Sequence, residues 1–177
     1  MKHLTSIVFV FSLLTTLYSE KIDYYWRDYE GEIPDDALPA GSDRNHKATY
    51  VGQVYIPEHG LLPTRIYEGK QSVTASKNGI HTSDVFVKIL CSNQSGKLSW
   101  IPTTAAKLHN DTAGKHVVIG GTEDEKVLNI GRVSFQGEVI VGKVCSYNTG
   151  SANLYFPYDG QEIGVASYEI LIYEKTY

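Results

Sequence analysis

The chain has 177 residues, of which 42% are hydrophobic and 20% charged, and its formal net charge is −4. This length and composition are typical of one folded domain or of two small modules with a shared core, and they exclude a disordered or fibrous protein. The acidic balance argues against nucleic acid as a partner.

The chain opens on a stretch that is typical of a secretory signal peptide, residues 1–19. MKHLTSIVFVFSLLTTLYS places one lysine before an apolar run and ends on the small Ser19. The run from Leu4 to Tyr18 is interrupted by serine and threonine, and it is shorter than the about 20 residues that a membrane-spanning helix needs. We therefore expect a secreted, extracellular protein with no membrane insertion.

Strand signals dominate the rest of the chain, which holds 13 tyrosines and 16 glycines and shows no helical stripe. The stretch AGSDRNHKATYVGQVY at 40–55 is answered by IGGTEDEKVLNIGRVS at 119–134, where two glycines, a lysine and a valine recur after 79 residues. The pattern predicts an all-β fold of two tandem antiparallel β-sandwich-like modules packed on each other. We place these modules at 24–91 and 98–174.

Each module contains one clear β-hairpin. In the second module, KVLNIGRVSFQGEVIVGKVCSY alternates in hydrophobicity and reverses at residues 136–137, and the first module has a matching pair of strands around residues 57–60. Gly52 and Gly131 interrupt the first strand of each pair, which indicates a bulge or the close approach of another backbone. We expect the two modules to pack against each other at these glycines.

If the chain is exported, its two cysteines could form a disulfide and its two sequons could be glycosylated. Cys91 and Cys145 are candidates for one disulfide between the modules, and two buried free thiols are the alternative. Asn93 and Asn110 head the sequons NQS and NDT and are candidate N-glycosylation sites.

No arrangement typical of catalysis or metal binding stands out. The 6 histidines show no ligand spacing. VVIGGTEDE lacks the third glycine and the following helix of a phosphate-binding loop, and the neighbouring acids sit on turns rather than across a cleft. We expect no metal, no cofactor and no enzymatic activity.

The order of motifs resembles the DM-nine (DM9) domain family. GEIPDDALPAGSDRNHKATYVGQVY and GLLPTRI are followed by LNIGRV, GEVIVGKV, NLYFPYDGQE and YEIL. The tandem repeats of that family carry an IPxxA turn, a YVGR strand, an LLPGK turn, a YxPYGGKE loop and a final YEVL. The resemblance covers nearly all of the chain after residue 19. It implies paired all-β modules that bind mannose-type glycans, as the lectins of the family do.

The resemblance also implies a sugar site in the first module. In the lectins of the family, an aspartate after the AG turn and a lysine in the PGK turn hold the sugar, and these positions fall here on Asp43 and, with a change, Arg65. An ionised acceptor opposite a charged donor suits the hydroxyl pairs of a hexose. The alternative is that Asp43 caps its own turn and that Arg65 is a solvated strand residue.

In the second module the same positions fall on Thr122 and Lys143. Because threonine stands where the acid belongs, the adjacent Glu123 and Asp124 are candidate substitutes. The intact GK and PYDG motifs favour the second module as the working site.

Tyr155 and Tyr158 flank the PYDG loop and are second-rank candidates for ligand contact. Taken together, the sequence predicts a secreted carbohydrate-binding recognition protein, directed at mannose-type glycans on microbial or host surfaces as in innate immunity. Two modules, or a homodimer, would supply avidity. One alternative is a secreted protein-interaction or structural factor with decayed sugar sites. Another is a polysaccharide hydrolase that works through an acid pair.

Overall fold

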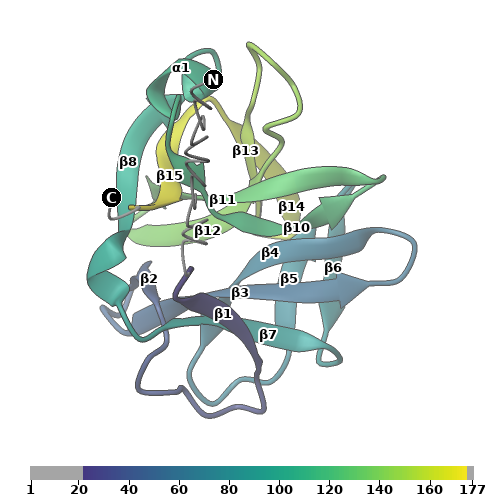
Figure 1. Ribbon diagram of the computed structural model, residues 1–177. Coiled ribbons are helices and arrows are strands. Elements are labelled where there is room, and N and C mark those ends of the chain that lie inside the picture. The colour runs from purple at the N-terminus through teal and green to yellow at the C-terminus, as the bar shows by residue number, and fades with distance from the viewer. Residues whose placement is uncertain (1–21, 175–177) are drawn as a thin grey trace, which may run out of the picture.

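The computed structural model describes residues 22–174, so the predicted signal peptide at 1–19 lies outside the described residues. Within 22–174, antiparallel strands hold more than half of the residues, and the helical structure is one short helix, α1 (Leu108–Asp111), and one 3-10 turn, Ser95–Lys97 (Figure 1). The prediction of an all-β fold is confirmed. None of the helices in this range has the length and apolar character that crossing a membrane requires.

The strands fall into two sets that follow each other along the chain. The first set comprises β1 (Tyr24–Asp28), β2 (Pro39–Ser42), β3 (Ala48–Ile56), β4 (Gly60–Tyr67), β5 (Val73–Ser76), β6 (Ile80–Ser83) and β7 (Val87–Ser92). The second set comprises β8 (Leu98–Thr104), β9 (His116–Val117), β10 (Ile119–Glu123), β11 (Lys126–Phe135), β12 (Glu138–Val144), β13 (Leu154–Tyr158), β14 (Gln161–Val165) and β15 (Ser167–Tyr173). We call these sets the first and second repeat.

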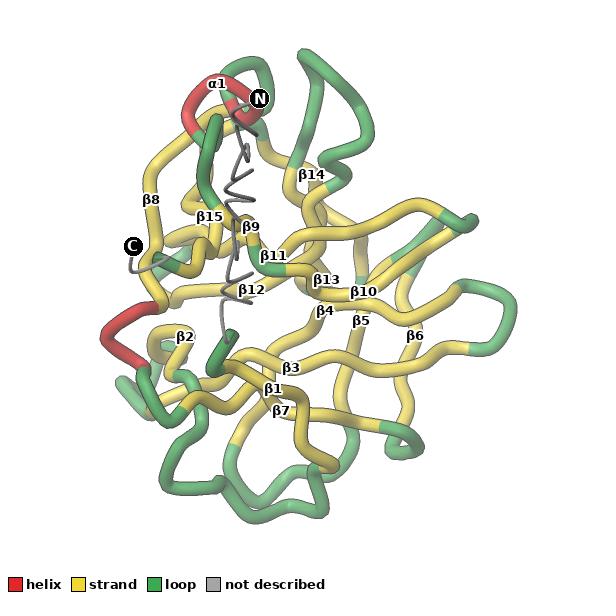
Figure 2. Tube along the Cα trace, viewed as in Figure 1, coloured by secondary structure: helices red, strands yellow, loops and turns green. Residues whose placement is uncertain are grey.

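The second repeat copies the strand pairing of the first. In the first repeat β1 pairs with β7, β7 with β3, and β3 with both β2 and β4; in the second, β8 pairs with β15, β15 with β11, and β11 with both β10 and β12. The hairpin of β5 and β6 corresponds to that of β13 and β14. In Figures 1 and 2 the first repeat fills the lower half of the view and the second the upper half.

Both predicted hairpins are present. Gln136 and Gly137 have φ values of 51° and 82°, and they join Phe135 to Glu138. Two successive residues in the left-handed region make the type I′ turn that suits the twist of a two-residue hairpin. In the first repeat, Ile56 pairs with Gly60 across the turn that the sequence predicts.

The prediction that the repeats meet at Gly52 and Gly131 is wrong. A Cβ on Gly52 would lie 2.7 Å from the Ile66 side chain and 3.2 Å from the Lys88 carbonyl oxygen, both in the first repeat. A Cβ on Gly131 would lie 2.6 Å from Val144, in the second repeat. Each glycine therefore allows close packing inside its own repeat.

The seam between the repeats instead uses Gly41 and Gly121. A Cβ on Gly41 would lie 2.4 Å from Val139 of β12, and a Cβ on Gly121 would lie 1.9 Å from the Leu61 carbonyl oxygen of β4. The two contacts are reciprocal, since β2 meets β12 and β10 meets β4. The repeats are thus related by an approximate two-fold arrangement.

Apolar side chains are shared across this seam. One buried cluster of the first repeat takes in Leu128 and Cys145 from the second. A second cluster combines Leu38, Ala40, Val51 and Leu90 of the first repeat with Leu98, Val118, Ile130, Val141, Leu171 and Tyr173 of the second. A third cluster lies within the second repeat, around Phe156. The two repeats therefore bury a common core.

Of the two alternatives for the cysteines, the structure shows the second, since Cys91 and Cys145 are both free and buried. Each thiol has separate surroundings: the Cys145 Sγ points to the Glu123 carboxylate at 3.5 Å, whereas Cys91 lies beside Asp36. Burial, with the Asp36 charge, raises the pKa of Cys91 to about 12, and burial also raises that of Cys145. Thiols held protonated in this way are unreactive.

The two sequon asparagines, Asn93 and Asn110, are both exposed. Asn93 follows β7 in a turn, and Asn110 lies in α1. Glycosylation at either position stays a prediction.

Candidate functional site

The strand registers make Arg65 and Lys143 equivalent positions. Arg65 lies opposite Val51 in the pairing of β3 with β4, and Lys143 lies opposite Ile130 in the pairing of β11 with β12. Val51 and Ile130 are separated by the 79-residue spacing that the sequence shows. The two basic residues therefore occupy the same place in the two repeats.

For the acid of the second repeat, the strand register gives a different counterpart from the Thr122 that the sequence motifs indicate. The Asp43 backbone N–H donates to the Lys47 carbonyl at 2.9 Å, and in the second repeat Glu123 pairs with Lys126. Because the second turn is one residue shorter, Glu123 is the counterpart of Asp43. Thr122 instead pairs with a strand of the first repeat at the seam, and its side chain is exposed.

An open hollow of about 550 Å³ lies where the first repeat faces the turn between β13 and β14. We call it the inter-repeat hollow. Residues of both repeats line it: Asp43, Arg44, Asn45, Arg65, Tyr67, Lys70, Glu138, Pro157, Tyr158 and Asp159. A second hollow of about 280 Å³ shares Arg65, Tyr67, Lys70, Pro157, Tyr158 and Asp159 with it and continues along β5. The two form one groove between the repeats.

Asp43 both caps its turn and lines this hollow. Its Oδ1 accepts hydrogen bonds from the backbone N–H groups of Asn45 and Lys47, at 2.8 and 2.9 Å. These bonds, together with the nearby charges of Lys47 and Arg65, lower the pKa of Asp43. The carboxylate is therefore ionised and held in a fixed orientation at the mouth of the hollow.

Arg65 is not a solvated strand residue, because its side chain is only 13% exposed. Its Nη1 donates to Glu138 Oε2 at 2.6 Å and to the Val139 carbonyl at 3.2 Å. The guanidinium carbon stacks 4.8 Å from the centre of the Tyr67 ring. Glu138 belongs to the second repeat, so this ion pair crosses the seam.

Tyr158 reaches the inter-repeat hollow and Tyr155 does not line it. Arg44 donates to the Tyr158 hydroxyl, stacks over its ring at 5.4 Å, and lies 3.4 Å from Glu138. Tyr155 instead faces the Lys143 ammonium, 5.9 Å from its ring centre. Of the two second-rank candidates, the hollow brings in only Tyr158.

The lining of the inter-repeat hollow balances its charges. Three cations, Arg44, Arg65 and Lys70, face three acids, Asp43, Glu138 and Asp159. The rings of Tyr67 and Tyr158 add apolar faces. Such a surface offers many hydrogen bonds without a net charge, which suits a neutral polyhydroxyl ligand.

The corresponding residues of the second repeat are buried. Lys143 Nζ lies 2.6 Å from Glu123 Oε2 and 3.5 Å from Glu162, and the Tyr147 hydroxyl donates to Glu123 at 2.8 Å. The side chains of Lys143 and Glu123 are 6% and 4% exposed. Burial acts to raise the pKa of Glu123, but hydrogen bonds from Lys143 and Tyr147 outweigh it and leave the pKa lowered.

A lysine of the first repeat completes this group. Lys77, in the turn between β5 and β6, lies 2.5 Å from Asp124 and 3.9 Å from Glu123. The buried side chains of Lys77, Glu123 and Lys143 form the centre of this group, with Glu162 partly exposed and Asp124 exposed at its edge. We call these five residues the buried ion cluster. The sequence motifs favoured the second module as the working site, whereas the open hollow belongs to the Asp43 turn.

Sequence reasoning missed several residues at these sites, among them Glu138, Lys77 and Glu162. Glu138, the first residue of β12, and Lys77, in the turn between β5 and β6, both face the opposite repeat, and nothing in their local sequence indicates that contact. Glu162 is the last residue of the YFPYDGQE motif. That motif was therefore a signal for it.

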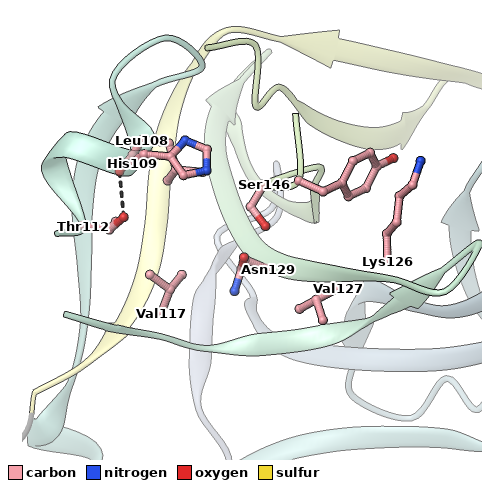
Figure 3. A pocket seen from close by; sticks show the side chains of 9 residues that line it. Leu108, His109, Thr112, Val117, Lys126, Val127, Asn129 and Ser146 are labelled. Atoms are coloured by element: carbon pink, nitrogen blue, oxygen red, sulfur yellow. Dashed lines mark hydrogen bonds between the residues drawn. The ribbon is translucent and has the colours of Figure 1, made fainter. Parts of the chain in front are cut away.

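A further hollow of about 330 Å³ lies in the second repeat beside α1 (Figure 3). Leu108 and His109 stand on one side, Lys126 on the other, and Val117 and Val127 lie along the strands below. The lining includes no carboxylate, and Lys126 lies 4.7 Å from the centre of the Tyr147 ring. This hollow lacks the paired acid and base of the inter-repeat hollow.

The repeated strand order and the reciprocal glycine seam define an all-β protein of two interlocked repeats. A family model for the DM9 repeat matches residues 43–165, which is more than half of the chain. The chain therefore belongs to the DM9 repeat family.

Among solved structures, the chain is similar to the nematode sperm cell motility protein MFP2B, with a TM-score of 0.63 and 14% sequence identity. The match covers 99% of this chain and 50% of that one, so the chain spans about half the length of MFP2B. At this identity the likeness shows the fold alone. No curated protein matched the chain.

Proposed function

We propose that the protein binds carbohydrate in the inter-repeat hollow, without catalysis. The observation that carries the proposal is that Asp43, Arg65 and two tyrosine rings line one open hollow of about 550 Å³. A carboxylate accepts hydrogen bonds from sugar hydroxyls, a guanidinium donates to them, and an aromatic ring covers the apolar face of a pyranose.

A neutral hexose of the mannose type is the ligand that we propose. The balanced charges of the lining disfavour a strongly charged ligand. A guanidinium carries five N–H donors, and Arg65 gives two bonds to Glu138 and Val139, so donors remain for a sugar. The resemblance of the Asp43 and Arg65 positions to those of the family's lectins supports the same ligand class.

The setting that we propose is extracellular recognition of glycans on microbial or host surfaces. The signal-peptide pattern of residues 1–19 supports export. The exposed sequons at Asn93 and Asn110 are compatible with passage through a secretory pathway.

The test is a glycan array on the chain from Glu20 onward, with free mannose as competitor, followed by titration calorimetry with methyl α-mannoside. Arg65→Met removes the guanidinium, and Asp43→Asn removes the charge while keeping a residue that caps turns. Each variant should bind at least about tenfold more weakly, which corresponds to about 1.4 kcal/mol.

Arg27→Met is the matched control, because Arg27 is an exposed arginine whose ion pair with Asp36 lies outside the hollow. It should bind as the unchanged protein does. Unchanged affinity in both hollow variants would contradict the proposed site, and silence across the array from folded protein would contradict the function.

A protein-interaction role is the second candidate, and one observation favours it. Phe86 is 71% exposed and has φ 54°, a backbone region that bulky residues rarely adopt. It meets the exposed Tyr55 edge-on at 6.5 Å and follows the exposed Val85. Exposed apolar clusters of this kind mark contact surfaces. Phe86→Ser should weaken the binding of a protein partner and leave glycan binding unchanged.

A further inference from the structure

The inter-repeat hollow and the buried ion cluster are counterparts under the approximate two-fold arrangement. Each combines an acid turn and a basic strand residue of one repeat with a hairpin turn of the other. Tyr158 pairs with Gln161 before the turn that faces the hollow, and Ser76 pairs with Ile80 before the turn that carries Lys77. Lys77 is thus the first residue of its turn, as Asp159 is in the other.

The two counterparts differ in what fills the space between acid and base. In the hollow, the turn residue Asp159 is exposed and the space of about 550 Å³ is open. In the cluster, the Lys77 ammonium occupies the corresponding place, 2.5 Å from Asp124 and 3.9 Å from Glu123. Its side chain is only 8% exposed.

A second difference explains why the acid of the second repeat is unavailable to a ligand. Arg65 takes its carboxylate partner, Glu138, from the other repeat. The counterpart of Glu138 across the seam is Gly60, where a Cβ would lie 2.2 Å from the Thr122 carbonyl oxygen. Lys143 therefore pairs with Glu123, the acid of its own repeat.

Glu123 is also saturated by other donors. Its Oε2 accepts from Lys143, and its Oε1 accepts from the Tyr147 hydroxyl and the Cys145 thiol. Asp43, by contrast, accepts hydrogen bonds at Oδ1 from backbone N–H groups of its own turn. A ligand hydroxyl can approach Asp43 from the hollow but would have to displace protein donors at Glu123.

We propose that each chain carries one carbohydrate site, and that the counterpart site is closed by Lys77 acting as an internal ligand. This inference rests on the proposed function of the inter-repeat hollow. The buried ion cluster then clamps the hairpin of β5 and β6 to the second repeat. Multivalent binding requires a second chain, because one chain cannot engage two sugars.

Titration calorimetry with methyl α-mannoside measures the number of sites. The unchanged protein should bind one sugar per chain, and Arg65→Met should bind at that one site at least about tenfold more weakly. The double variant Glu123→Gln with Lys143→Met removes both charges of the second pair together and should still bind one. If the unchanged protein bound two sugars per chain, the inference of a single site would be overturned and the proposed function would stand. If the unchanged protein bound no sugar, both would be overturned.

Amine labelling followed by mass spectrometry tests the clamp independently of any sugar. Lys77 and Lys143 should react about tenfold or more slowly than the partly exposed Lys88, because reaction requires local opening of the cluster. Equal rates in folded protein would overturn the clamp.

Asp124→Asn serves if the double variant fails to fold, because the Asp124 side chain is 68% exposed and its loss leaves the Glu123 pair intact. This variant should raise the labelling rate of Lys77 and keep one sugar site. If the labelling rate of Lys77 did not change, Asp124 would not hold Lys77 in the cluster. If a second sugar bound, the protein donors to Glu123 would not be what keeps the counterpart site closed.

Discussion

Glu123 is held ionised in the interior by the groups around it. Burial favours its protonated form, but Lys143 and Tyr147 donate hydrogen bonds to the charged form, and Lys77 adds a further positive charge. The pKa of Glu123 in the folded chain is therefore below its unfolded value of about 4.3. Such a group stabilises the fold above the unfolded pKa, and the contribution disappears as pH falls through the folded pKa.

Replacing this carboxylate should destabilise the protein in a pH-dependent way. At about pH 7, Glu123→Gln removes the nearer acidic partner of the buried Lys143 ammonium and leaves Glu162 at 3.5 Å. We expect a loss of about 3 kcal/mol in the free energy of unfolding. Near pH 3 the difference should shrink, because the native carboxyl is then being protonated as well. Urea unfolding at the two pH values measures both quantities.

Glu125→Gln is the matched control for this experiment. Glu125 lies on the same turn but is exposed, so its replacement should change the free energy of unfolding little at either pH. A loss in Glu123→Gln that stays the same from neutral to acid pH would show that its charge is not what stabilises the cluster.

At the scale of elements, the seam depends on two strand contacts that tolerate no side chain. Gly121 of β10 passes against the β4 backbone, and Gly41 of β2 passes against Val139 of β12. Because a carbonyl oxygen of the main chain cannot rotate away as a side chain can, the Gly121 contact is the less forgiving of the two.

Gly121→Ala should therefore lower the melting temperature. The added Cβ would lie 1.9 Å from the Leu61 carbonyl oxygen, and overpacking of this kind costs about 1–3 kcal/mol or more. Gly96→Ala is the control, since a Cβ there would meet nothing within 4 Å. Equal melting temperatures of the two variants, measured by circular dichroism, would contradict the close approach of β10 and β4.

At the scale of the whole molecule, the two repeats behave as one packing unit. Buried clusters mix side chains from both repeats, and the ion pairs of Arg65 with Glu138 and of Lys77 with Asp124 each join a cation of the first repeat to an acid of the second. Neither repeat can bury all of its apolar residues without the other.

Thermal unfolding should accordingly occur in one cooperative transition. Cooperative loss of a shared core makes the calorimetric enthalpy equal to the van't Hoff enthalpy. Differential scanning calorimetry of the chain from Glu20 onward measures both. Two resolved transitions would mean that the repeats unfold separately.

The sequence by itself determined the local architecture and the family. Alternating strands and turn residues predicted the all-β fold and both hairpins, because these signals act between residues close in the chain. The 79-residue repeat and the order of motifs pointed to tandem DM9 repeats. Motif positions also identified Asp43, Arg65 and Lys143, and the structure makes Arg65 and Lys143 counterparts of each other.

Only the tertiary structure decided how these positions are used. A fixed spacing assigned the second acid to Thr122, but strand pairing moves it to Glu123 because one turn is a residue shorter. Whether a pocket is open depends on which side chain the other repeat places in it. Glu138 lies 73 residues along the chain from its partner Arg65, and Lys77 lies 47 residues from its partner Asp124. Contacts over such separations are set by packing across the seam, which leaves no local pattern in the sequence.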